Sequence, residues 1–119
     1  IQQLGYLQQI DIYEMLFQEE GTSPIIIDAQ DLLQEPKKML IKVCKSLRIT
    51  FDEKMLSWPS GSRKTDGIWG KYWYKQVEAS VGFKPYVKTN RIVPSKYQVI
   101  YHKCMEYYDF LYQNRIILN

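Results

Sequence analysis

The sequence is poor in the residues that most often mark a catalytic or metal centre. It has one histidine and two cysteines in 119 residues, too few for a zinc site or a disulfide framework. No Ser–His–Asp arrangement is legible, because nothing marks a partner for the single histidine, His102. His102 lies close to Cys104 in the sequence, but we expect a surface histidine and a core thiol there, with no metal.

Long hydrophobic runs are also missing. No stretch approaches the roughly 18–20 apolar residues that cross a bilayer, so we expect no membrane span. The first residues are amphipathic and show no basic segment followed by an apolar run, which argues against a signal peptide. The chain does not begin with methionine, which suggests a fragment. Cys44 and Cys104 fall on helix faces and predict buried thiols in a reducing compartment, hence a cytoplasmic location.

Strong charge of either sign is absent. The net charge is +3 and forms no basic tail. A nucleic-acid partner is not expected, because such proteins concentrate Lys and Arg on one surface; a small helical nucleic-acid binder is the lowest-ranked hypothesis. A local basic cluster suited to one phosphate-sized anion fits the charge better. With 45% hydrophobic and 24% charged residues, residues 1–119 are expected to fold as one globular domain or part of one.

What the sequence does contain is helical periodicity. Apolar residues recur every three or four positions in several stretches, and these are bounded by the usual start and stop residues. The predicted helices are residues 4–17, ended by Gly21; 37–47, preceded by Pro36; a short helix to Leu56 with a capping box from Thr50 to Glu53; and a last helix from Pro94 to Tyr112.

One stretch predicts a strand. Ile25–Ile27 is a continuous apolar run bounded by Pro24 and Asp28, which is typical of a strand covered on both faces of a parallel sheet. Such a strand needs neighbours, and the chain has no second convincing one. We therefore expect a missing N-terminal half or a partner chain to cover Ile25–Ile27. This chain itself is predicted to be mostly α-helical with one or two short strands.

A second stretch, residues 56–83, contains all three tryptophans. Its loop, Ser60–Gly67, carries the pair Arg63–Lys64. Arg offers a planar fork to a phosphate and Lys a point charge, and the start of the following helix adds backbone N–H groups, so the loop predicts an anion site. The alternative is an exposed loop with solvated charges before a core-packed helix. The residues predicted to share one face of that helix are Trp69, Tyr72, Trp73, Gln76 and Val77.

Within this stretch we expect Trp73 in the core and Gly82 at the helix end. Trp58 and Trp69 are predicted to be more open, where they offer a stacking platform for an adenine or an aromatic acceptor. The sequence Gly67–Lys71 is not a nucleotide phosphate-binding loop, because its glycine spacing is wrong.

Two carboxylates flank the end of the predicted strand. Asp28 and Asp31 follow Ile25–Ile27, and ligands bind at the carboxyl ends of strands in α/β sheets. For Asp31, capping of the next helix is an equally good interpretation.

The sequence also resembles a known family. The run PIIIDAQDLLQEPKKMLIKVCKSL, then ITFDEKMLSWPSGSRKTDGIWGKYWYKQVEASVGF, is similar to the C-terminal half of sulfotransferase-family proteins. The motifs are a strand ending in D-x-x-D-L-L, the phrase M-L-x-W-P-x-G-x-R, and the tract D-G-x-W-x-x-x-W-Y-x-x-V-x-x-S-x-G-F. The similarity covers nearly the whole chain. It implies an α/β fold class, with this chain as the C-terminal half of a P-loop-like three-layer domain.

The resemblance implies transfer of a sulfuryl group from phosphoadenosyl phosphosulfate to a hydroxyl or amine of a small-molecule acceptor. It implies that Arg63 and Lys64 contact the 3′-phosphate of the donor, that Gly67 lets the backbone approach, and that Trp69 lies in the same element. Two positions depart from the family pattern. Thr65 stands where a glycine is usual, and Ala29 stands where members often have a tyrosine near the adenine.

The resemblance also implies that the phosphosulfate-binding loop and the catalytic base lie in the N-terminal half. No residue here is therefore assigned a catalytic role, and the chain is expected to be active only when joined to that half. The competing hypothesis is a non-catalytic binding or assembly module, derived from a truncated sulfotransferase scaffold, whose strand and apolar helix faces dock on a partner.

Overall fold

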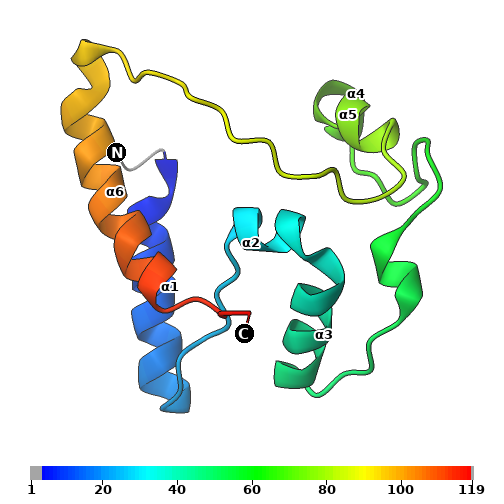
Figure 1. Cartoon of the computed structure of the whole chain (residues 1–119), viewed down its shortest axis with the longest axis horizontal. Coiled ribbons are helices and arrows are strands. Elements are labelled where there is room, and N and C mark those ends of the chain that lie inside the picture. Colours follow the sequence, from blue (N-terminus) through cyan, green and yellow to red (C-terminus); the bar gives the residue numbers. More distant parts are fainter. Residues whose placement is uncertain (1–3, 119) are drawn as a thin grey trace. The chain divides into compact units, whose positions relative to one another are not determined.

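The computed structural model describes residues 4–118 and is mostly helical, as predicted (Figure 1). The chain divides into two units. The first combines both ends of the chain, Ile1–Ala29 and Val87–Asn119, and the second is Gln30–Tyr86. None of the helices in the described range has the length and apolar character needed to cross a bilayer.

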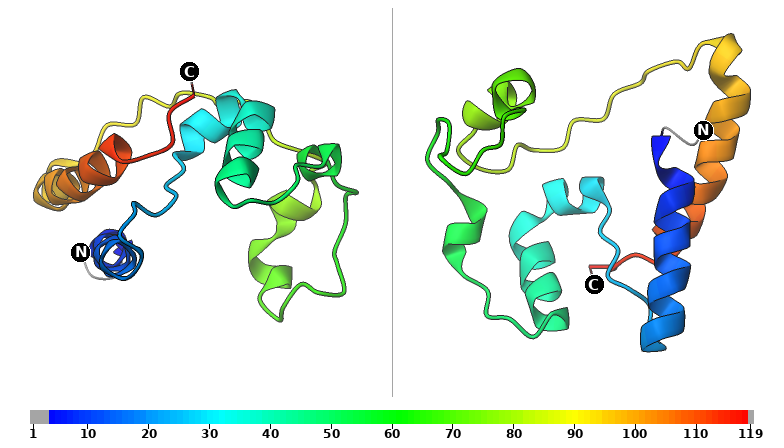
Figure 2. Two further views of the ribbon diagram at one scale, coloured as in Figure 1. Left: turned by 90° about the horizontal axis from the view of Figure 1, so that it is seen from below. Right: turned by 180° about the vertical axis from the view of Figure 1, so that it is seen from behind.

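The first unit is built on two helices that lie side by side, α1 (Tyr6–Glu20) and α6 (Gln98–Gln113), with η3 (Ser95–Tyr97) leading into α6 (Figures 1 and 2). The ring of Tyr13 meets that of Phe110 edge to face, with 5.2 Å between centroids. Helix α1 ends as predicted at Gly21, whose φ of 68° suits glycine and whose N–H donates to the Phe17 carbonyl at 2.9 Å.

The predicted strand at Ile25–Ile27 is not formed. The segment carries no strand assignment, and the Ile116 N–H donates to the Ile26 carbonyl at 2.9 Å. A strand requires a run of such bonds with a neighbour, and within residues 4–118 the β pairing is a single bridge between Ser57 and Gly82. Ile25 and Ile27 remain 37% and 39% exposed. The apolar run is therefore present without the neighbours that would cover it.

The second unit is organised around α3 (Pro36–Ser46), which starts at Pro36 as predicted and follows α2 (Ala29–Gln34). Helix α3 buries Met39 completely and Cys44 almost completely. Cys44 and Cys104 are buried free thiols, as predicted. Leu47, the last residue of the predicted helix, lies just after the observed helix ends and is more than half exposed.

The short helix η2 (Glu53–Leu56) contacts α3. Glu53 pairs with Lys37, and the sulfur atoms of Cys44 and Met55 lie 3.8 Å apart. The predicted cap at Thr50 is wrong. Asp52 caps the helix instead, its carboxylate accepting from the Lys54 N–H at 2.9 Å, because the helix begins later than the capping-box pattern implies.

The predicted single aromatic helix is also wrong. The structure has two one-turn helices, α4 (Gly70–Trp73) and α5 (Lys75–Glu78), which are separated at Tyr74 and end before Gly82. Trp73, predicted in the core, is 75% exposed. The helical spacing of these residues predicts a common apolar face. A helix is stabilised mainly by packing of such a face against another segment, and at Trp73 the face is exposed.

We expect Met39→Ala to lower the free energy of unfolding by about 2–4 kcal/mol, because the substitution leaves a cavity where a fully buried side chain was packed. Urea titration followed by circular dichroism measures the change. The matched control is Met15→Ala on α1, where the side chain is about half exposed and the change should stay below about 1 kcal/mol. Equal losses for the two variants would contradict this assignment of the core.

Candidate functional site

The loop that carries the predicted anion site is closed at its base. We call the paired residues 57–61 and 78–82 the loop neck. Its backbone contacts are the Trp58 N–H to the Val81 carbonyl at 3.1 Å, the Gly61 N–H to the Glu78 carbonyl at 2.7 Å, and the antiparallel bridge of Ser57 with Gly82. The neck fixes the two ends of the loop relative to each other.

Gly82 has a role in the neck that sequence reasoning missed. A Cβ built on Gly82 would lie 3.0 Å from the Leu56 carbonyl oxygen, closer than side chains normally approach a backbone atom. Glycine is therefore needed for the close approach of the two chain segments, and not for the end of a helix. Nothing in the local sequence signals this, because the contact joins residues that are far apart along the chain.

Of the four residues predicted to bind the sulfuryl donor, Arg63, Lys64 and Gly67 lie in the loop, and Trp69 lies just after it at the start of α4. Arg63 and Lys64 are exposed, and the salt bridges found in the described part of the chain involve other residues. Trp69 is 64% exposed, and its ring lies 6.3 Å from that of Tyr72. A Cβ at Gly67 would meet no atom within 4 Å, so this position opens onto free space.

The expected contribution of backbone N–H groups is corrected by the structure. The Arg63 N–H donates to the Asp66 carboxylate at 2.8 Å, and the Asp66 N–H donates to the Arg63 carbonyl at 3.0 Å. These donors are already used within the loop. Helix α4 has only four residues, too few for the aligned peptide dipoles of a long helix. An anion bound here would therefore be held mainly by the two cationic side chains.

The net positive charge of the chain falls in this region. Between Ser60 and Tyr86 there are five basic and two acidic residues, so the segment carries the full net charge of +3 and the remaining residues are balanced. The basic residues are Arg63, Lys64, Lys71, Lys75 and Lys84, and the acidic ones are Asp66 and Glu78. A local excess of positive charge attracts anions to the loop.

Asp28 lies in the first unit, beside a small hollow of about 80 Å³ that Tyr112 and Arg115 also line. Its carboxylate accepts a hydrogen bond from the Tyr108 hydroxyl at 2.9 Å. Burial, followed by this bond to Asp28, raises the pKa of Tyr108 to about 12. Asp31 lies in the first turn of α2, which favours its interpretation as a helix-start residue.

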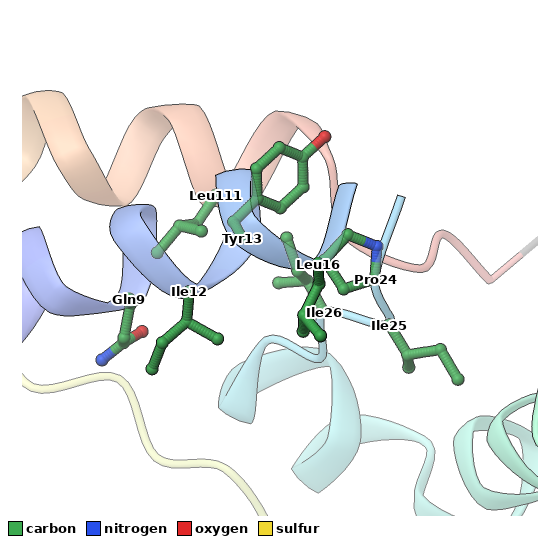
Figure 3. Close-up of a pocket in the computed structure, with 8 residues that line it drawn as sticks. All are labelled: Gln9, Ile12, Tyr13, Leu16, Pro24, Ile25, Ile26 and Leu111. Atoms are coloured by element: carbon green, nitrogen blue, oxygen red, sulfur yellow. The ribbon is translucent and has the colours of Figure 1, made fainter. Parts of the chain in front are cut away.

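A larger apolar hollow of about 250 Å³ lies between α1, the 24–26 segment and α6 (Figure 3). Figure 3 shows the Tyr13 hydroxyl pointing away from the side chains of Ile12 and Ile26. The side chains that line the hollow are mostly apolar, and Gln9 is the polar exception beside Tyr13. Among the described residues, no group of three His, Cys, Asp or Glu side chains converges to hold a metal ion.

Comparison with known proteins gives a consistent match over most of the chain. A family model described as a sulfotransferase domain matches residues 4–110. Two Arabidopsis thaliana proteins, named branched-chain-amino-acid aminotransferase-like proteins 1 and 2, are 35% and 34% identical over 109 residues, or 92% of this chain. The chain spans about a fifth of the length of these curated relatives, 20% and 19%. No solved structure matches.

The pKa of Tyr108 gives a pH-dependent prediction. The pKa of Tyr108 in the folded chain, about 12, lies above the ordinary tyrosine pKa of 10.0, so the unfolded chain releases the Tyr108 hydroxyl proton at lower pH. The contribution of this group to the free energy of unfolding is therefore fully present below pH 10 and should be lost as pH rises toward 12. In Tyr108→Phe this loss should be absent. Urea titrations across that range measure it, and the difference in tyrosinate absorbance between wild type and variant should titrate near pH 12. A difference spectrum titrating near pH 10 would contradict the assignment.

Proposed function

This chain belongs to the sulfotransferase domain family, and on that premise we propose that it forms the 3′-phosphate side of a binding site for phosphoadenosyl phosphosulfate. Arg63 and Lys64 bind the phosphate, Gly67 gives it room near the backbone, and Trp69 offers a ring face to the nucleotide. The observation that carries the proposal is a pair of exposed cations on a loop whose two ends are fixed by the loop neck.

The chemistry of the two cations suits a phosphate. The guanidinium of Arg63 presents parallel N–H donors to two phosphate oxygens, and the ammonium of Lys64 adds a compact charge. Neither side chain takes part in the salt bridges found among the described residues, so no internal carboxylate has to be displaced. The Asp66 carboxylate is held by the Arg63 backbone N–H, which gives it a partner other than the guanidinium.

The reaction we propose is sulfuryl transfer to a hydroxyl or amine of a small-molecule acceptor. The sulfuryl group leaves the donor, which becomes adenosine 3′,5′-bisphosphate, and the acceptor loses a proton to a base. We assign neither that base nor the phosphosulfate-binding loop to this chain. Residues 1–119 then form the C-terminal portion of one sulfotransferase-like α/β domain, and an N-terminal portion supplies the remaining groups.

The exposed segment at Ile25–Ile27 supports this division of the domain. Its backbone accepts one hydrogen bond from Ile116, while Ile25 and Ile27 remain partly exposed. Strands from an N-terminal portion would complete the pairing and bury these side chains, at about 25 cal/mol per Å² of apolar area removed from water. That burial would convert the extended segment into the strand that its sequence predicts.

A second candidate, a non-catalytic binding module, is favoured by one observation. Apolar side chains on α1, Ile12 and Met15, are about half exposed, as are those of the Ile25–Ile27 segment to a lesser degree. A separate partner chain would cover the same surface. The aminotransferase-like names of the two relatives support no proposal for this chain, since only about a fifth of each is matched.

Replacing both cations tests the proposed function. In the full-length protein that carries this chain, Arg63→Ala/Lys64→Ala should weaken binding of adenosine 3′,5′-bisphosphate by roughly a hundredfold, since each charge-assisted bond contributes about 1.5–3 kcal/mol and part of that is lost to solvent screening. Isothermal titration calorimetry measures the dissociation constants.

The matched control is Lys88→Ala/Arg91→Ala, which removes the same charge from exposed positions outside the loop. It should change affinity by less than about threefold, the size of a screened long-range effect. Equal losses for the two double variants would mean that overall charge, and not the loop, binds the ligand. An absence of any affinity in the wild type would favour the binding module.

A further inference from the structure

Trp58 differs from the other two tryptophans of the loop region. Trp69 and Trp73 are largely exposed, whereas Trp58 is partly buried in the loop neck. Its indole N–H donates to the Ser80 hydroxyl oxygen at 3.0 Å, and that hydroxyl donates to the Val77 carbonyl at 2.6 Å. One chain of hydrogen bonds thus runs from the segment before the loop to the segment after it.

The indole is also held by its ring. The Trp58 and Phe83 rings meet edge to face, with 5.4 Å between centroids and an angle of 82°, the arrangement that aromatic pairs prefer. The backbone N–H of Trp58 donates to the Val81 carbonyl. Three independent contacts therefore fix this residue against residues 80–83, while neither Arg63 nor Lys64 touches it in the hydrogen bonds and ring contacts of the described chain.

We propose that Trp58 and Ser80 are positioning residues for the two cations of the loop. The inference rests on the proposed function and adds which contacts hold the loop in place before a ligand binds. The loop beyond the neck has exposed side chains and short helices, so ordering it on binding would oppose affinity through lost conformational freedom. The Trp58–Ser80 bond fixes the two ends of the loop before a ligand binds. Fewer residues then have to be ordered on binding, so the entropic cost of binding is smaller.

The bond acts through geometry and not through charge. Indole and hydroxyl are both neutral, and their hydrogen bonds form a connected chain that ends on a backbone carbonyl. Losing the Ser80 hydroxyl leaves the indole N–H of Trp58 without its partner, and losing the indole removes the bond that crosses the neck. The neck then opens more often, and Arg63 and Lys64 spend less time in the arrangement that grips a phosphate.

The experiment measures binding of adenosine 3′,5′-bisphosphate to the full-length protein by calorimetry and the hydrogen exchange of the Gly61 amide by mass spectrometry or NMR. Trp58→Phe should weaken binding roughly threefold to tenfold, the effect of one neutral hydrogen bond. Ser80→Ala, which also loses the bond to the Val77 carbonyl, should weaken binding at least as much, and both variants should speed exchange at Gly61. Ser80→Thr keeps the hydroxyl and should restore binding. Trp73→Phe, the same substitution at an exposed tryptophan, should leave both measurements unchanged.

A positioning role for Trp58 predicts one further result. In the Arg63→Ala/Lys64→Ala background, Trp58→Phe should cause no additional loss of affinity, because the residue acts through those cations. Additive losses would overturn the inference.

The outcomes separate this inference from the proposed function. If the double cation variant binds roughly a hundredfold more weakly than the wild type, while Trp58→Phe and Ser80→Ala bind as the wild type does, the inference is overturned and the proposed function stands. A wild type without affinity overturns both. Should Trp58→Phe fail to fold, the Ser80→Ala and Ser80→Thr pair decides the question alone.

Discussion

The antiparallel pairing of residues 57–61 with 78–82 is the constraint on which the candidate site depends. The segment between them has exposed side chains and two one-turn helices, and little of it is buried. Without a fixed base such a loop would sample many arrangements. Backbone hydrogen bonds, the Trp58–Ser80 bond and the close approach at Gly82 close the base of the loop. The closed base limits the positions that Arg63 and Lys64 can adopt.

The rest of the described chain buries few of its apolar side chains. Met39 is buried fully, and Cys44, Cys104 and Leu111 nearly so. Large apolar side chains are exposed on α1, α4 and the extended segment after α1. The family match over residues 4–110, set beside curated relatives about five times longer than this chain, supports a common account in which other parts of the protein cover these surfaces.

Local chemistry made several elements predictable. Gly21 ends α1 because only a residue that tolerates a positive φ can occupy that position without strain. Pro36 begins α3 because it lacks a backbone N–H that the first helical turn does not use. The predictions that depended on distant neighbours did less well. Trp73 has the spacing of a core residue, yet no described segment packs over it. Ile25–Ile27 has the composition of a buried strand, yet within the described residues it forms no β-sheet pairing with a neighbour.

The sequence by itself determined the helix boundaries at Gly21 and Pro36, the buried thiols of α3 and α6, the position of the basic pair and the family. These follow from local sterics, local periodicity and motif, which act within a few residues. Only the tertiary structure decided that Trp58, Ser80 and Gly82 close the loop, that the loop backbone bonds to itself, and that Tyr108 reaches Asp28. Most of those contacts join residues far apart along the chain, and their formation depends on how the backbone folds in three dimensions.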